Sequence, residues 1–382
     1  MSLAAGLVGL GGLAIGTGAY VASAATLLRL RRRQRGNRET SFTPPVSIVK
    51  PLRGLDEGLE ENLESFFRLD YPSSELEVVF SFASSSDPAY APARRVADRH
   101  PEVSSTFVFD EREPGGNAKV NRLAAAMRYA KHRLILFSDG NVRVRPGFLR
   151  RAVSWFRDPR VGLVSNLFRA AGAESLGSRV EALYLNGCLM PGTALVADVL
   201  GTPCVVGKSI LVSRRALDTI GGIGALRDYL AEDFVLGRET RRAGYRVILS
   251  ADVLDTMEVG KPLRVVWQRH RRWSMMRRRL AGQLYVGEAL IGALPWFVLS
   301  LAAPGAPLKA VAGALLGLRW GAELAVIRAW GDPIDWRDAA LLPVRDAFAA
   351  AVFFAGLVGR TLAWRGRPLV VGPDTRILKE TA

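Results

Sequence analysis

Cysteine is scarce in this sequence of 382 residues, which has only Cys188 and Cys204. The two lack CxxC spacing and have no histidine pair nearby, so the usual zinc-site patterns are missing. Two cysteines do not form a disulfide framework either. Reduced thiols that face the cytoplasm are therefore the expectation.

Several signatures of common protein classes are also missing. The chain contains neither GxGxxG nor GxxxxGK[ST], which disfavours a dinucleotide dehydrogenase or a P-loop enzyme. It has no GxSxG elbow, which disfavours that type of hydrolase. No helix-turn-helix, zinc-finger or RNA-binding pattern stands out, so we expect no nucleic acid among the partners.

Charged side chains are absent from residues 1–28, and Leu3 to Leu28 is long enough to cross a bilayer as a helix. An arginine cluster follows this run, whereas a cleaved signal peptide carries its positive charges before the apolar core. The positive-inside tendency places the N-terminus outside and the next domain in the cytoplasm. The alternative interpretation is a buried helix of a soluble protein.

Basic charge is abundant: the formal net charge is +16, while 49% of the residues are apolar. The basic clusters at 29–38 and 269–279 adjoin apolar runs. That placement suits an anionic membrane surface better than a nucleic-acid-binding stripe.

The C-terminal third is apolar again, in stretches at 289–308, 310–327 and 339–359. The first contains three prolines, which favours a broken or re-entrant segment over a clean span. Arg319 and Glu323 stand four residues apart on the second and are expected to pair. Arg345 and Asp346 on the third must face protein or water, because charge is costly at that depth. Two or three membrane segments are expected here.

Residues 44–275 alternate between short apolar runs and helical periodicity. The predicted strands are 46–49, 76–82, 105–109 and 134–137, and the predicted helices are 59–69, 91–99 and 118–129. This order predicts an α/β domain with a mostly parallel sheet, which binds ligands at the carboxyl ends of its strands. Arg53, Asp87 and Asp139 follow strand ends, and this coincidence is the first functional signal.

Two carboxylates are candidates for chemistry. Asp139, in Ser-Asp-Gly-Asn-Val, is suited to a divalent cation that bridges a diphosphate, although Asp-Gly-Asn is equally good turn chemistry. Asp233 follows a glycine-rich loop and is placed to take a proton from an incoming hydroxyl. Its alternative role is that of an acid favoured at a helix N-terminus.

Two basic motifs complete the candidates. Arg269 and Arg272 are suited to clamp a diphosphate, and Trp273 to stack on a sugar or a lipid headgroup. A basic membrane-surface helix is the alternative interpretation of the same run. Lys119 opens a helix after a glycine turn, which suits either an anion contact or a surface position.

Taken in order, these motifs resemble the processive-type family-2 glycosyltransferases. More closely, they resemble the ceramide glucosyltransferases and their bacterial relatives, including the hopanoid-associated enzymes. The resemblance is carried by Pro51-Leu52-Arg53-Gly54, Asp87-Pro88, Asn117-Ala118-Lys119-Val120-Asn121, Asp139-Gly140-Asn141, Ala231-Glu232-Asp233 and Arg269-His270-Arg271-Arg272-Trp273.

The resemblance implies a GT-A fold with flanking transmembrane helices, a UDP-sugar donor, inversion, and Mg²⁺ or Mn²⁺. Asp233 would be the general base, Asp139 would bind the metal and diphosphate, and Trp273 would line the acceptor site. The donor-binding residues would be Pro51, Arg53, Asp87, Lys119, Asp139, Arg269 and Arg272. One departure is Asn141, which stands where many GT-A enzymes have a second aspartate and weakens the expectation of a metal.

The expected organisation has a transmembrane helix (1–30), a basic linker (31–43), the GT-A domain (44–275), a membrane-embedded region of two or three helices (276–363) and a polar tail (364–382). The expected reaction transfers a hexose, with glucose foremost, to a hydroxyl of ceramide or a similar membrane lipid. Other acceptors are a hopanoid or another polyol lipid, with glucose or N-acetylglucosamine. The short C-terminal membrane region disfavours processive polysaccharide synthesis. A non-catalytic membrane-surface scaffold is the alternative of another class.

Overall fold

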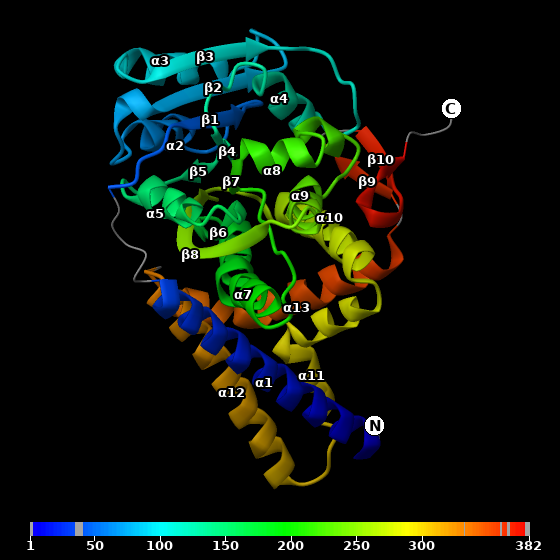
Figure 1. Ribbon diagram of the computed structural model, residues 1–382. Coiled ribbons are helices and arrows are strands. Elements are labelled where there is room, and N and C mark those ends of the chain that lie inside the picture. The colour runs from blue at the N-terminus through cyan, green and yellow to red at the C-terminus, as the bar shows by residue number, and fades with distance from the viewer. Residues whose placement is uncertain (1–2, 35–40, 332, 360, 365–366, 379–382) are drawn as a thin grey trace. The chain divides into compact units, whose positions relative to one another are not determined.

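The computed structural model describes residues 3–34, 41–331, 333–359, 361–364 and 367–378. The chain alternates between two compact units (Figure 1). The sheet unit consists of Leu30–Phe168, Gly201–Met257 and the chain from Thr375 onward. The helical unit consists of the chain up to Arg29, Arg169–Leu200 and Glu258–Asp374.

An eight-stranded mixed sheet forms the framework of the sheet unit, with the strand order β3-β2-β1-β4-β7-β6-β8-β5. Its strands are β1 (Val46–Pro51), β2 (Leu76–Phe82), β3 (Ser104–Phe109), β4 (Leu134–Ser138), β5 (Val142–Arg143), β6 (Val161–Ala171), β7 (Ser209–Ser213) and β8 (Arg246–Met257). The flanking α-helices are α2 (Leu59–Phe67), α3 (Tyr90–Arg99), α4 (Ala118–Ala126), α5 (Phe148–Ser154), α8 (Arg214–Thr219) and α9 (Glu232–Arg242). A short strand, β11 (Ile377–Leu378), lies near the C-terminus.

The parallel half of the sheet is the part that the sequence predicted. Strand β1 pairs in parallel with both β2 and β4, and β2 pairs in parallel with β3. Successive residues of β1 are buried in two different hydrophobic clusters, one on each face of the sheet. Ile48 is in the cluster that contains Phe66 of α2, and Val49 is in the cluster that contains Leu123 of α4. A strand buried on both faces reads as a continuous apolar run, which is why these strands were recognisable.

The other half of the sheet is antiparallel, through the pairs β4–β7, β6–β7 and β5–β8. The prediction of a mostly parallel sheet was therefore wrong for this half, and the sheet is mixed. Its pairings join segments far apart in the chain, so no local pattern reports them.

The helical unit is built mainly from helices of different lengths. They are α1 (Leu3–Gln34), α6 (Leu176–Tyr184), a π-helical turn (Leu185–Leu189), α7 (Met190–Asp198), α10 (Leu263–Ala281), a 3₁₀ segment (Gly282–Leu290), α11 (Ala293–Ser300), α12 (Ala306–Ala329) and α13 (Trp336–Val358). Strands β9 (Thr361–Trp364) and β10 (Arg367–Val371) pair antiparallel.

Four helical stretches of the described chain are long and apolar enough to cross a membrane: Leu3–Gln34, Leu176–Asp198, Ala306–Ala329 and Trp336–Val358. A fifth candidate is the pair Leu263–Leu290 and Ala293–Ser300, which is bent by 55°. The bend agrees with the predicted break near the prolines. The stretch Leu176–Asp198 was not singled out from the sequence, because Arg179, Glu181 and Pro191 interrupt its apolar pattern.

Charged side chains inside the helical unit are paired with one another. Arg319 donates to the carboxylate of Glu323, as their spacing predicted, and Arg345 donates to the other oxygen of Glu323. Arg345 also lies 2.9 Å from Asp346, and all four side chains are almost completely buried. These four charges, which lie away from the ends of α12 and α13, therefore face protein, as the cost of exposing them to lipid requires.

Candidate active site

The loops that follow β1 and β2 meet at the same edge of the sheet. The carboxylate of Asp87 accepts hydrogen bonds from the backbone N–H groups of Gly54 and Ala89, both at 2.9 Å. Pro51 ends β1, and the side chain of Arg53 is exposed just beyond it. The structure thus brings Pro51, Arg53 and Asp87 together at the carboxyl ends of two adjacent parallel strands.

A second group of predicted residues is centred on Lys119, in the first turn of α4. Asn117 caps this helix, because its side chain accepts from the N–H groups of Lys119 and Val120. The Lys119 ammonium lies 2.8 Å from Asp139 Oδ1 and 3.3 Å from Glu232 Oε1, and it donates to the carbonyl of Gly207 at 2.9 Å. Lys119 therefore links the strand-end acid to the acidic start of α9.

The charges of this group shift one another's proton affinity. Burial alone would lower the pKa of Lys119, but the carboxylates of Asp139 and Glu232 outweigh it and raise that pKa. Burial opposes ionisation of Asp139, while Lys119 and Lys208 outweigh it and hold the pKa of Asp139 below its usual range. The lysine and Asp139 are thus both charged at neutral pH.

Two further lysines lie at Asp139, and the sequence analysis missed both. Lys208 Nζ lies 3.6 Å from Asp139 Oδ2 and donates to Asn141 Oδ1 at 3.0 Å. Lys50 is 1% exposed and donates to Ser138 Oγ at 3.0 Å and to the carbonyl of Asp139 at 3.2 Å. A lysine at the end of an apolar strand, as Lys50 is at the end of β1, was the available signal.

Burial lowers the pKa of Lys50 well below its ordinary value, although Asp139 opposes this shift. Its Nζ atom also lies 3.2 Å from the centre of the Phe66 ring. The ammonium groups of Lys119 and Lys208 lie beside Asp139 at the end of β4 and suit a ligand that carries negative charge.

Asp233 lies in the first turn of α9 and is held by two backbone donors. Gly207 N–H donates to its Oδ2 and Phe234 N–H to its Oδ1, both at 2.8 Å. A side chain at position 207 would bring its Cβ within 2.9 Å of Oδ2, so glycine permits this close approach. Burial, followed by the charge of Glu232, raises the pKa of Asp233 to about 6. A carboxylate with that pKa is suited to accept a proton near neutral pH.

The third group of predicted residues lies on α10, in the helical unit. Arg269 is held 2.6 Å from Glu258 and 3.1 Å from Glu181, both completely buried. His270 is 2.9 Å from the same oxygen of Glu181, and its ring packs edge-on at 5.0 Å from that of Trp273. Neither Glu181 nor Glu258 was singled out from the sequence.

Arg269, Arg272 and Trp273 share one face of α10, since they are spaced three and four residues apart. Both Arg272 and Trp273 are partly exposed. This face presents cationic and aromatic groups, as the motif predicted, within the helical unit.

A divalent cation would find oxygen ligands of the right kind at Asp139 and Asn141. Among the described residues, however, no group of three or more His, Cys, Asp or Glu side chains is arranged to hold a metal. Both oxygens of Asp139 and the amide oxygen of Asn141 face lysine ammonium groups. The residues fit Mg²⁺ or Mn²⁺ only as an ion shared with substrate phosphates, which is the usual way in which Mg²⁺ is held.

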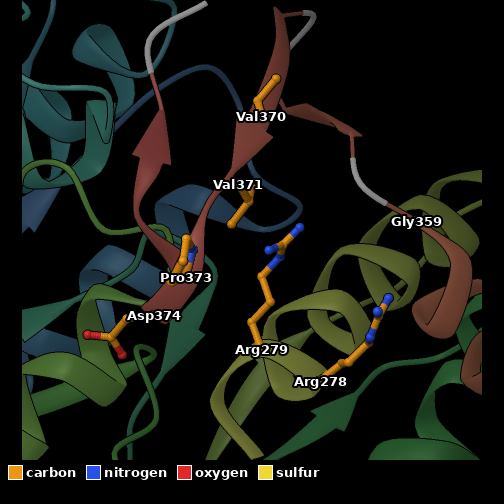
Figure 2. Close-up of a pocket in the computed structure, with 7 residues that line it drawn as sticks. All are labelled: Arg278, Arg279, Gly359, Val370, Val371, Pro373 and Asp374. Atoms are coloured by element: carbon orange, nitrogen blue, oxygen red, sulfur yellow. The ribbon is translucent and has the colours of Figure 1, made fainter. Parts of the chain in front are cut away.

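A separate cavity of about 530 Å³ lies in the helical unit (Figure 2). Its lining residues are Arg278, Arg279, Gly359, Val370, Val371, Pro373 and Asp374. Arg278 donates to the carbonyls of Gly356 and Leu357, and Arg279 to that of Gly372. Both guanidinium groups thus hold main-chain carbonyls, and none of the predicted site residues lines this cavity.

The sheet topology and the polar cluster at its strand ends define a GT-A-type fold. In agreement, the chain is similar to the mannosyltransferase PcManGT of Pyrobaculum calidifontis, solved in complex with GDP-Man and Mn²⁺. The TM-score is 0.54 at 21% identity, over 92% of this chain and 99% of that one. The predicted fold class is confirmed.

The model of Glycosyl transferase family 21 matches residues 14–377, and the chain belongs to this family. Similar proteins include ceramide glucosyltransferases 1 and 3 of Caenorhabditis elegans. Identity is 30% to each, over 248 and 259 residues, which is 65% and 68% of this chain and 53% and 56% of theirs. The chain spans about half the length of these curated relatives. The predicted family resemblance is confirmed.

Proposed function

We propose that this protein transfers a hexose from a UDP-sugar to a hydroxyl of ceramide or a similar membrane lipid, with inversion at the anomeric carbon. The observation that carries the proposal is the linkage of Asp139, Lys119, Glu232 and Asp233 at the carboxyl ends of the strands. It places Lys119, with Lys208 close by, where a diphosphate could bind, next to a carboxylate suited to act as a base. The family and the long apolar helices support a lipid acceptor.

The donor occupies the sheet edge in this proposal. Asp87, with Pro51 and Arg53 beside it, contacts the nucleoside. Lys119 and Lys208 neutralise the diphosphate beside Asp139, assisted by Arg269 and Arg272. Cations placed where charge develops on a leaving group lower the barrier to its departure.

Asp233 is the base for the acceptor in this proposal. The lipid hydroxyl oxygen attacks the anomeric carbon, and its proton passes to Asp233. The bond from that carbon to the diphosphate oxygen breaks, and UDP leaves with the bonding electrons. A single displacement of this kind inverts the configuration. Trp273 lines the acceptor site, where an aromatic face suits a sugar or a lipid headgroup.

In this proposal Asp139 would hold Mg²⁺ or Mn²⁺, and Asn141 would supply a neutral oxygen ligand. When bound, it supplies further positive charge at the leaving diphosphate. The Mn²⁺ in the mannosyltransferase structure supports this assignment as an analogy of fold.

We further propose that the catalytic domain faces the cytoplasm at a bacterial inner membrane. The arginines at the C-terminal end of α1, after its apolar run, favour this orientation. The proposed organisation keeps a transmembrane helix (1–30), a basic linker (31–43), a GT-A domain (44–275), a membrane-embedded region (276–363) and a tail (364–382). Residues 169–200 and 258–275 of the proposed GT-A domain belong to the helical unit.

Mass spectrometry of lipids made by the purified protein tests the reaction. Ceramide, a hopanoid polyol and diacylglycerol are each offered with UDP-glucose, UDP-N-acetylglucosamine and GDP-mannose. Hexosylceramide from UDP-glucose is expected. A product on the hopanoid alone would identify a hopanoid as the acceptor and would leave the proposed sugar-transfer reaction unchanged. Absence of glycolipid with every pair would favour a membrane-surface scaffold, for which Asp87, Asp139 and Asp233 are dispensable.

A further inference from the structure

The last described residues of the chain lie against the loop that leads into α9. Leu230 N–H donates to the carbonyl of Thr375 at 2.9 Å, and Ala231 N–H donates to Thr375 Oγ1 at 3.3 Å. Ile377 N–H donates to the carbonyl of Asp228 at 2.8 Å. Residues 375–378, called the tail segment below, thus pair with residues 228–231, called the acid loop.

Side chains reinforce this pairing. Tyr229 and Arg376 form an antiparallel bridge, and Arg376 Nε donates to the Tyr229 hydroxyl at 3.2 Å. The Arg376 guanidinium also lies 5.3 Å from the centre of the Tyr229 ring. The contact therefore extends over both partners and is not a single hydrogen bond.

Thr375 adopts a backbone conformation that its side chain disfavours. Its φ is 59° and that of Asp374 is 55°, in the left-handed region. A β-branched residue there is a genuine outlier, which persists only where surrounding contacts fix it. Thr375 is completely buried, so the acid loop supplies contacts that hold it in place.

The acid loop leads directly to Glu232 and Asp233. Ala231 stands at the N-cap of α9, where its methyl side chain cannot accept a hydrogen bond. Thr375, 144 residues further along the sequence than Ala231, supplies the acceptors instead. Its carbonyl accepts from Leu230 N–H and its hydroxyl from Ala231 N–H. Capping acceptors satisfy N–H groups that a helix start leaves without partners.

On its other side the acid loop is tied to the start of α4, which carries Lys119. Asn117 N–H donates to the carbonyl of Arg227 at 2.7 Å, and its amide donates to the Tyr229 carbonyl at 2.8 Å and to Glu232 at 3.1 Å. The acid loop therefore lies between α4 and the tail segment, and both fix its position.

We propose that Thr375 is a positioning residue for the reaction: through the tail segment it fixes the acid loop, and thereby the placement of Asp233 at the start of α9. This inference rests on the proposed role of Asp233 as the base. Thr375 itself acts only through the backbone of residues 230 and 231.

Thr375→Val tests the inference, because it keeps the shape of the side chain and removes the hydroxyl acceptor. We expect kcat to fall about 10- to 100-fold, since small displacements of reacting groups have effects of that size. KM for the UDP-sugar should change less than kcat, because Lys119 is also held by Asp139 at the end of β4, away from the acid loop. Thr375→Ser should restore kcat. Thr219→Val, which removes an exposed threonine hydroxyl on α8, is the matched control and should behave as wild type.

The pH profile of kcat separates positioning from a general loss of stability. The groups that face Asp233 are Lys119, Glu232 and the N–H groups of Gly207 and Phe234. Loosening the acid loop admits water and relieves the burial that raises the pKa of Asp233. The acidic limb of the profile should therefore move to lower pH in Thr375→Val and return in Thr375→Ser.

If Thr375→Val does not fold, Ile377→Pro removes the N–H bond to Asp228 at a partly buried point of the tail segment and should give the same pattern. The positioning role of Thr375 alone would be overturned if the folded tail-segment variants kept the kcat and pH profile of the wild type while Asp233→Asn was inactive. Full activity of Asp233→Asn would instead overturn the base on which it rests.

Discussion

At the scale of single residues, Lys119 connects the parts of the candidate site. Its ammonium neutralises Asp139 and Glu232, which belong to segments almost a hundred residues apart in the sequence. The sequence identified Lys119 only as a contact for an anion. Its partners became visible once the fold brought the ends of β4 and the start of α9 to the same place.

Replacing Lys119 with methionine leaves two partly buried carboxylates without their main counterion. We expect a loss of about 1–3 kcal/mol in the free energy of unfolding at pH 7. Because Lys119 holds the pKa of Asp139 down, the stability that it contributes is present above the ordinary pKa of aspartate and is lost as pH falls. The difference from wild type should therefore keep its size down to about pH 4 and shrink towards about pH 3.

Thermal unfolding in detergent at pH 7 and at about pH 3 measures this effect. Lys131→Met, at an exposed lysine, is the control and should change little. Equal losses at both pH values would contradict the electrostatic explanation.

Asn141 sets the strength of the proposed metal site. Exchanging its neutral amide for a carboxylate, in Asn141→Asp, adds a charged oxygen ligand, and ligand charge raises affinity for a hard cation. In the presence of UDP we expect Mn²⁺ to bind about tenfold more tightly, as measured by titration of the free Mn²⁺ signal in electron paramagnetic resonance. Asp139→Asn should weaken binding. Unchanged Mn²⁺ affinity in both variants would place the metal elsewhere.

At the scale of elements, the sequence identified those strands and helices whose patterns are local. The apolar runs of β1, β2 and β4 and the periodicity of α2 and α3 were sufficient. The antiparallel pairings could not be predicted, because they depend on long-range contacts. The same holds for Lys208, which becomes part of the site only when β7 pairs beside β4.

Helix α1 approaches its neighbour through glycines. A Cβ at Gly9 would lie 2.3 Å from the backbone nitrogen of Ser300 in α11, and one at Gly6 would lie 2.1 Å from that of Ala303. Small residues at such spacing let helix backbones pack closely. The charge-free glycine-rich run that predicted a membrane helix therefore also encodes a packing surface.

Gly9→Ala should destabilise the protein by about 1–3 kcal/mol, because a methyl group forced against backbone costs that much. Gly11→Ala is the matched control, since a Cβ there meets no described atom within 4 Å. In the control, the better helix propensity of alanine should raise stability by up to about 1 kcal/mol. Thermal unfolding of both variants checks this, and changes of the same sign would contradict the close packing of α1.

At the scale of the whole molecule, the chain alternates between the two units, and each unit contains some of the residues proposed to bind substrate or catalyse the reaction. The acids and lysines belong to the sheet unit, and the basic aromatic motif of α10 belongs to the helical unit. The net charge of +16 and the long apolar helices agree with work at an anionic membrane surface. The family could be predicted from the order of the motifs along the sequence. The pairing of the tail segment with the acid loop before Asp233 could not be predicted, because no local pattern in the sequence indicates it.

The central claim is that Asp233 takes the proton of a lipid hydroxyl during sugar transfer. The most direct measurement is the pH dependence of glycolipid formation by wild type and Asp233→Asn, together with UDP-sugar binding. Wild-type activity should rise with pH through about 6 and then level off, because Asp233 must be deprotonated to act. Asp233→Asn should lose about 10²- to 10⁴-fold in rate and keep its affinity for the donor. Asp98→Asn, at an exposed aspartate, should match wild type. A fully active Asp233→Asn, or a wild-type rate that is flat across this pH range, would contradict the account.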